Sequence, residues 1–112
     1  MEKLIKDGMV AVLYSRGYGA GWYSWNLDVN ECLFCPQIVG LVLANGDCDE
    51  MDRNVAKRIE EIANSNWGVN FYHGGASQLV VGWVKAGNQF EIKEYDGNES
   101  LIDLGESQYL TA

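Results

Sequence analysis

Positive charge is scarce in this chain. Eight Lys and Arg stand against sixteen Asp and Glu, and the formal net charge is −8. No basic run occurs, so the chain repels phosphate backbones, and we expect no direct binding to nucleic acid. Long apolar runs are lacking too: the longest, 38–44, is far below the roughly 20 residues that span a bilayer. The first eight residues also lack the features of a signal peptide. We therefore expect no membrane association.

Histidine and cysteine are few, which limits the chemistry available. The single His, His73, cannot form a His-based metal site. Cys32 and Cys35 form a C-x-x-C pair, but Cys48 belongs to no second close pair. Buried, inert thiols are therefore favoured over a zinc or redox site, and we expect no metal and no cofactor. An odd number of Cys with no disulfide framework indicates a reducing, cytoplasmic compartment.

Aromatic residues, by contrast, are plentiful. The 112 residues fit a single domain, 1–112, and include four Trp, six Tyr and three Phe. This exceeds what core packing alone requires, so some rings are expected to line a pocket or an interface.

Hydrophobic periodicity and turn signals predict an α+β fold. Asp7-Gly8 between two apolar runs is typical of a β-hairpin, whose second strand, 9–14, is apolar enough to be buried on both faces. Asp47 and Glu50 have the spacing of a capping box before the second helix. The expected strands are 3–6, 9–14, 67–72, 79–84, 89–95 and 100–103, and the expected helices are 36–45 and 48–64. We therefore predict an antiparallel sheet of about five strands with two helices packed on one face.

Residues 15–26 are the main candidate site, because glycines alternate there with aromatic rings. Gly-rich turns can gather backbone N–H groups around an anion, Arg16 can pair with a phosphate, and the rings can stack on a planar base. The alternative is a tight loop whose rings pack into the core. The spacing matches neither a Walker loop nor a dinucleotide fingerprint. The candidate ligand-binding residues are Arg16, Gly17, Tyr18, Gly19, Gly21, Trp22, Trp25 and His73.

A hydrolase has little support in the sequence. His73 could act as an acid or base with Ser15, Ser24 or Ser77, but no G-x-S-x-G pattern is present. A surface loop explains His73 as well.

Acidic residues gather towards the C-terminal end. Alternation along 89–95 explains some of them as a solvated face, and a functional acidic surface that mimics nucleic acid is the alternative. The set comprises Glu91, Glu94, Asp96, Glu99, Asp103 and Glu106.

Two segments carry a resemblance to known proteins. Residues 10–26 (VAVLYSRGYGAGWYSWN) and 79–84 with 90–101 (FEIKEYDGNESL) resemble a family of short proteins encoded by bacteriophages and prophages. That family has no assigned activity, so the resemblance implies no catalytic residue. It implies expression inside a bacterial cell, where small phage proteins often counter host defence.

The leading functional expectation is non-catalytic binding of a small, nucleotide-like ligand, as a sponge that sequesters a host signal. The alternatives are an acidic inhibitor that binds a host protein and an unrecognised hydrolase. Trp-rich loops also favour self-association, so a homodimer is compatible with the sequence.

Overall fold

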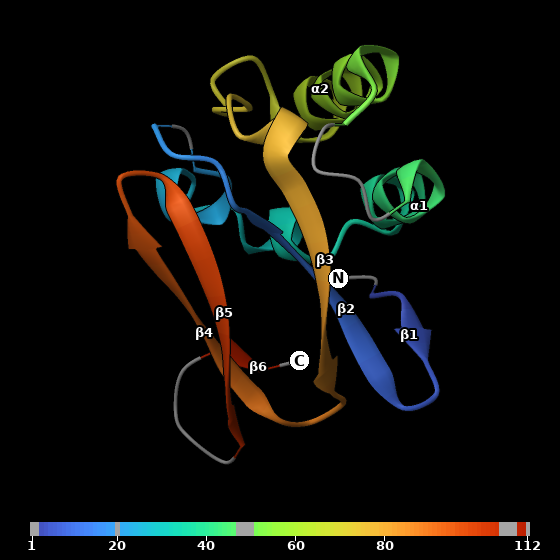
Figure 1. The fold of residues 1–112 in the computed structure, drawn as a ribbon, viewed down its shortest axis with the longest axis vertical. Helices are drawn as coiled ribbons and strands as arrows, with labels where there is room; N and C mark the ends of the chain where they lie inside the picture. The colour runs from blue at the N-terminus through green and yellow to red at the C-terminus, as the bar shows by residue number, and fades with distance from the viewer. Residues whose placement is uncertain (1–2, 20, 47–50, 106–109, 112) are drawn as a thin grey trace.

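The structure is a computed structural model that describes residues 3–19, 21–46, 51–105 and 110–111. Two α-helices and several strands follow one another in a mixed α and β order (Figure 1). The strands are β1 (Ile5–Lys6), β2 (Met9–Ser15), β3 (Leu79–Lys85), β4 (Gln89–Tyr95), β5 (Asn98–Gly105) and β6 (Leu110–Thr111). The helices are α1 (Pro36–Asn45) and α2 (Arg53–Trp67), with short 3-10 turns η1 (Tyr23–Trp25), η2 (Asn30–Leu33) and η3 (Ala76–Gln78).

The strands form two antiparallel sheets, so the expectation of one five-stranded sheet is wrong. The first sheet has the order β1-β2-β3 and the second the order β5-β4-β6. The predicted hairpin is present, with positive φ at Asp7 and Gly8, as its two-residue turn requires. β2 lies in the centre of the first sheet, which suits a strand predicted to be buried on both faces.

The apolar character of β2 explains why there are two sheets. Ala11 and Leu13 face a core shared with α1 and α2, whereas Val10 and Val12 face a second core shared with Phe90 of β4. Both faces of the strand therefore need cover. The helices supply it on one side and the β4–β5 hairpin on the other, so the hairpin packs across the first sheet and does not extend it. The result is three layers (Figure 1).

The first helix is confirmed and the second is displaced from its predicted position. α1 begins at Pro36, whose missing N–H costs nothing in a first turn. α2 is capped by Asp52, whose Oδ1 accepts the N–H of Asn54 at 2.8 Å. The predicted cap at 47–50 lies outside the described residues. The predicted strand 67–72 is wrong: α2 continues to Trp67, because its apolar stripe packs on the core up to that turn.

No helix in the described part of the chain combines the length and the apolar character that crossing a bilayer requires.

Candidate functional site

A buried carboxylate organises the Gly-aromatic segment. Glu99, on β5, has 1% of its surface exposed. Its Oε1 accepts the backbone N–H of Ser15 at 2.7 Å, and its Oε2 accepts the N–H groups of Trp22 at 2.9 Å and Ser24 at 2.7 Å. The Ser24 hydroxyl adds a fourth bond at 2.7 Å. The loop thus gathers backbone N–H groups around an anion, but the donors are Ser15, Trp22 and Ser24 and not the glycines, and the anion is the protein's own side chain.

The neighbouring carboxylate, Glu94, holds the same loop from its exposed side. Glu94 of β4 lies directly opposite Glu99 of β5. Its Oε2 accepts the indole N–H of Trp25 at 3.0 Å and the backbone N–H of Gly97 at 3.0 Å. These two bonds, that of Trp25 foremost, hold the pKa of Glu94 below its usual range. The β4–β5 hairpin therefore clamps the 3-10 turn η1 with two carboxylates.

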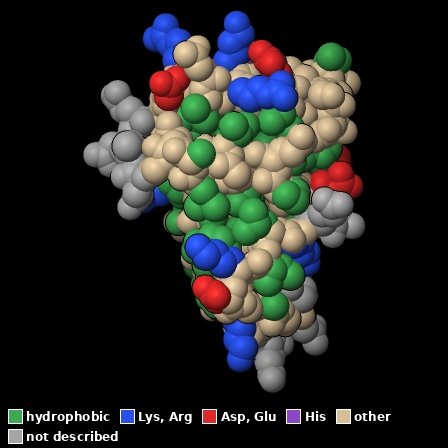
Figure 2. All heavy atoms as spheres, turned by 90° about the vertical axis from the view of Figure 1, so that its right-hand side faces the viewer, with side chains coloured by type: hydrophobic (Ala, Val, Ile, Leu, Met, Phe, Trp, Pro, Cys, Tyr) green, Lys and Arg blue, Asp and Glu red, His purple; other side chains and the backbone are tan. Residues whose placement is uncertain are grey.

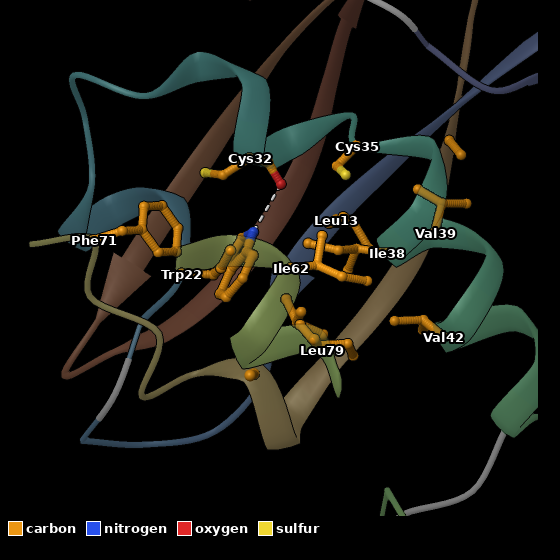
Figure 3. Close-up of a cluster of buried hydrophobic side chains, with 14 residues drawn as sticks. Leu13, Trp22, Cys32, Cys35, Ile38, Val39, Val42, Ile62, Phe71 and Leu79 are labelled. Atoms are coloured by element: carbon orange, nitrogen blue, oxygen red, sulfur yellow. Dashed lines mark hydrogen bonds between the residues drawn. The ribbon is translucent and has the colours of Figure 1, made fainter. Parts of the chain in front are cut away.

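Trp22 belongs to the core. Its side chain is 0% exposed, and its indole N–H donates to the carbonyl of Cys32 at 2.7 Å (Figure 3). Its ring meets Phe71 edge-on, with centroids 5.0 Å apart, and Trp67 at 6.2 Å. Both ends of the indole are thus occupied by the protein, and Trp22 offers no free ring face to a ligand.

Trp25 lies at the surface, in tilted contact with the ring of Tyr72, which was not among the candidate residues. Its centroid is 4.8 Å from that of Tyr72, and the two residues are 40% and 41% exposed. Asn26 joins their segments: its Oδ1 accepts the N–H of Tyr72, and its Nδ2 donates to the carbonyl oxygens of Tyr72 and Trp22. We call the surface formed by Trp25, Tyr72 and Glu94 the aromatic–acidic patch.

The three alternating glycines serve close packing more than left-handed turns. Only Gly19 has a positive φ, and its N–H donates to the carbonyl of Asp96. A Cβ on Gly17 would lie 2.4 Å from Cγ of Gln78, and one on Gly21 would lie 2.5 Å from Oγ of Ser24. The loop therefore presses against its neighbours and leaves little space for a ligand among its own residues.

Arg16 lies in a different place. Arg16 lines a pocket of about 500 Å³ between the end of α1 and the start of β3. It is the only Lys or Arg among the described residues that line this pocket. Those lining residues include Val42, Leu43, Gln78 and Leu79, and none of the selected aromatic residues. Gly46 and Met51 both line the pocket, and three acids lie between them in the sequence.

Tyr18 and His73, the last two candidate residues, also lie apart from the pocket that Arg16 lines. Tyr18 is 69% exposed, beside the β4–β5 turn that Gly19 contacts. His73 is half-buried, and its Nδ1 lies 3.2 Å from Oε1 of Glu60 on α2, close enough for an ion pair but not aligned as a hydrogen bond. The eight selected residues thus lie in several places and do not surround one cavity.

The C-x-x-C pair is built into the interior. Cys32 and Cys35 are both buried and both free thiols. Burial first, and then the negative charge of Glu99, raise the pKa of the Cys32 thiol far above its ordinary value. A thiol that stays protonated is a poor nucleophile and a poor metal ligand. Cys48 lies outside the described residues, and within those that are described no group of His, Cys, Asp or Glu could hold a metal ion.

The acidic set divides between surface and interior. Glu94, Asp96 and Asp103 are exposed and Glu91 is partly so. Glu99 cannot belong to a functional acidic surface, because it is buried and the N–H groups of the loop replace water around its carboxylate. Glu106 lies outside the described residues.

The sequence contains a signal for this clamp. The Asp96-Gly97 turn places Glu94 directly opposite Glu99, and like charges in that position destabilise a hairpin unless another group binds one of them. Tyr72 and Asn26 carry no comparable signal, since their contact joins segments 46 residues apart.

An apolar surface lies over α1 and β1. Figure 2 shows hydrophobic side chains gathered in the middle of this face, between charged side chains at its two ends. Ile5 is 59% exposed and Leu43 46% exposed. The α1 sequence contains no charged residue.

Comparison of the chain with models of known protein families, with curated proteins and with solved structures finds no match.

Proposed function

We propose that this protein is a non-catalytic binding protein whose aromatic–acidic patch docks on a positively charged surface of a partner protein. The observation that carries the proposal is the exposed Trp25 ring, held by its tilted contact with the ring of Tyr72 and by its hydrogen bond to Glu94. Trp and Tyr are the residues that most often dominate binding energy at protein interfaces. A ring held in place before binding also loses less entropy when it binds.

Charge favours a basic partner. The segments that supply the rings of the patch contain no Lys or Arg, since residues 17–52 and 59–84 lack both. Oε2 of Glu94 is occupied, whereas its Oε1 accepts no hydrogen bond within the described part of the chain. A Lys or Arg of the partner can therefore pair with this carboxylate while it lies over an aromatic face.

Two more exposed apolar residues lie close to Trp25 and Tyr72 along the chain. Leu27 is 63% exposed and follows Trp25 by two positions, and Val69 is 89% exposed in the turn before Tyr72. Exposed apolar groups rimmed by charge are typical of protein–protein sites.

Affinity capture with matched variants tests the proposal. The tagged chain should retain a basic protein from bacterial cells in fixed stoichiometry, and Trp25→Ala or Tyr72→Ala should abolish retention. Tyr95→Ala is the control, because Tyr95 is 78% exposed but lies on the strand position next to Glu94, facing the other side of the sheet. Retention should weaken as salt rises. If the Trp25→Ala variant retained the partner as the wild type does, the proposal would be contradicted.

Binding of a nucleotide-like ligand stays a prediction with less support. Arg16 does line a pocket of suitable size, about 500 Å³, but no aromatic residue is among the described residues that line it. Mixing the protein with cyclic nucleotides and recording its melting temperature tests this directly. The phage origin, the anti-defence role, the cytoplasmic location and the homodimer also stay predictions.

A further inference from the structure

The outer edge of β3 is a candidate for strand addition. β3 pairs with β2 on one side, and within the residues that the structure describes no strand pairs with its other side. The strand contains no Pro, and its only charge is Lys85 at its end. It therefore lacks most of the devices that protect exposed edges from pairing.

The register shows which backbone groups face outward. At the two ends of the β2–β3 pair, the carbonyl of Gln78 accepts the N–H of Arg16, and the N–H of Ala86 donates to Gly8. Even-numbered residues of β3 therefore bond towards β2. Because the direction alternates along an antiparallel strand, Val81 points its N–H and C=O away from β2, and Leu79 points its C=O away. The N–H of Leu79 donates to the carbonyl of Ala76 at the end of η3.

The residues that carry these groups line the pocket described above. Val80 and Val81 of β3 and Leu43 of α1 line the pocket, together with the buried side chains of Leu79 and Val42. We name this pocket the β3 groove.

Arg16 gives the groove a direction. It lies at the N-terminal end of β3, next to Gln78, and its guanidinium forms no ion pair with a described carboxylate. A strand that pairs antiparallel to β3 would bring its own C-terminal end to this position. The free carboxylate of a peptide could then pair with Arg16 in bidentate geometry.

We propose that the β3 groove binds the extended C-terminal segment of a partner polypeptide. The segment adds as an antiparallel strand to β3, its alternate apolar side chains contact Val42 and Leu43, and its terminal carboxylate pairs with Arg16. Backbone bonds supply affinity in such additions and side-chain pockets supply specificity. This site shares no residue with the aromatic–acidic patch, so either can fail without the other.

A library of random heptapeptides with free C-termini, selected against the wild-type chain, tests the proposal. Peptides with alternating apolar residues should be enriched. Val81→Pro removes one outward N–H in the groove and should weaken the binding of these peptides about tenfold, the loss expected for one hydrogen bond. Lys85→Pro is the matched control, because it removes an outward N–H beyond the groove. The affinity of the Lys85→Pro variant for the selected peptides should match that of the wild type.

The carboxylate is tested separately, so that the result does not depend on how well Val81→Pro folds. Amidation of the selected peptides, or Arg16→Gln, should weaken binding about tenfold, and Arg53→Gln on α2 should not. The proposal is overturned if no peptide is enriched, if Val81→Pro folds and binds as tightly as the wild type, or if amidation and Arg16→Gln leave the affinity unchanged.

Discussion

Trp22 and Trp25 lie three residues apart in one loop and differ in almost every physical respect. Trp22 is 0% exposed, meets Phe71 edge-on and donates its indole N–H to a backbone carbonyl. Trp25 is 40% exposed and donates its indole N–H to the side chain of Glu94. The first ring stabilises the fold, and the second is the centre of the proposed interface.

The two carboxylates that hold this loop differ in the same way. Glu99 has replaced its water by three backbone N–H groups and a hydroxyl, whereas Glu94 keeps one oxygen for solvent or a partner. One hairpin therefore carries a structural acid and an available acid at directly opposite positions. Residue type and spacing alone do not distinguish these roles, but substitutions should.

The largest effect is expected for Trp22→Ala, which leaves a cavity between the helices and the first sheet. We expect the free energy of unfolding to fall by about 3–5 kcal/mol, as for other buried aromatics. Urea denaturation measures it. Trp25→Ala should cost less than about 1 kcal/mol, because the exposed ring contributes less buried area. Equal losses for the two variants would contradict the division between core and surface.

Glu99→Gln should rank second. The amide nitrogen of Gln cannot accept a hydrogen bond, so it turns a donor towards the N–H groups of the loop and also removes the charge. We expect a loss of about 2–4 kcal/mol in the same assay. Glu94→Gln is the matched control, since its exposed bonds should contribute less than about 1 kcal/mol. An unchanged free energy of unfolding for Glu99→Gln would show that the buried carboxylate does not organise the loop.

Gly75→Ala should have a smaller effect through overpacking. A Cβ at this position would lie 2.7 Å from the carbonyl oxygen of Gly21, a backbone atom that cannot rotate away. We expect a loss of about 1–3 kcal/mol. Gly40→Ala is a control of opposite sign: its Cβ meets open space on α1, so helix propensity should stabilise the protein by about 0.5–1 kcal/mol. Melting temperatures of the two variants test the contrast.

The smallest expected effect on stability comes from the protonation of Glu94. Because its pKa is lowered in the folded protein, the contribution of this group to stability is present above the unfolded pKa, near 4.5, and is lost as pH falls through the folded pKa. Trp25→Phe removes the main cause, so the pKa of Glu94 should rise towards its ordinary value. An NMR titration of the side-chain carboxyl measures it. An unchanged pKa would show that the indole bond is not formed in solution.

Local patterns were sufficient for elements that depend on neighbours in the chain. Asp7-Gly8 placed the first hairpin, Pro36 began the first helix, and the apolar run of β2 indicated a strand buried on both faces. The sequence pattern does not predict the continuation of α2 to Trp67, because the Asn and Ser residues before Trp67 are typical of a turn. Tertiary packing of that last turn overrides their weak helix propensity.

The sequence by itself determined a single acidic α+β chain and an aromatic loop able to surround an anion. Only the tertiary structure decided that the anion is Glu99, that Trp22 is core and Trp25 surface, and that Arg16 faces a separate groove. The reason is that contacts such as Trp22 with Glu99 join segments 77 residues apart. Spacing along the chain carries little information about which distant group reaches a given N–H, because folding sets that distance.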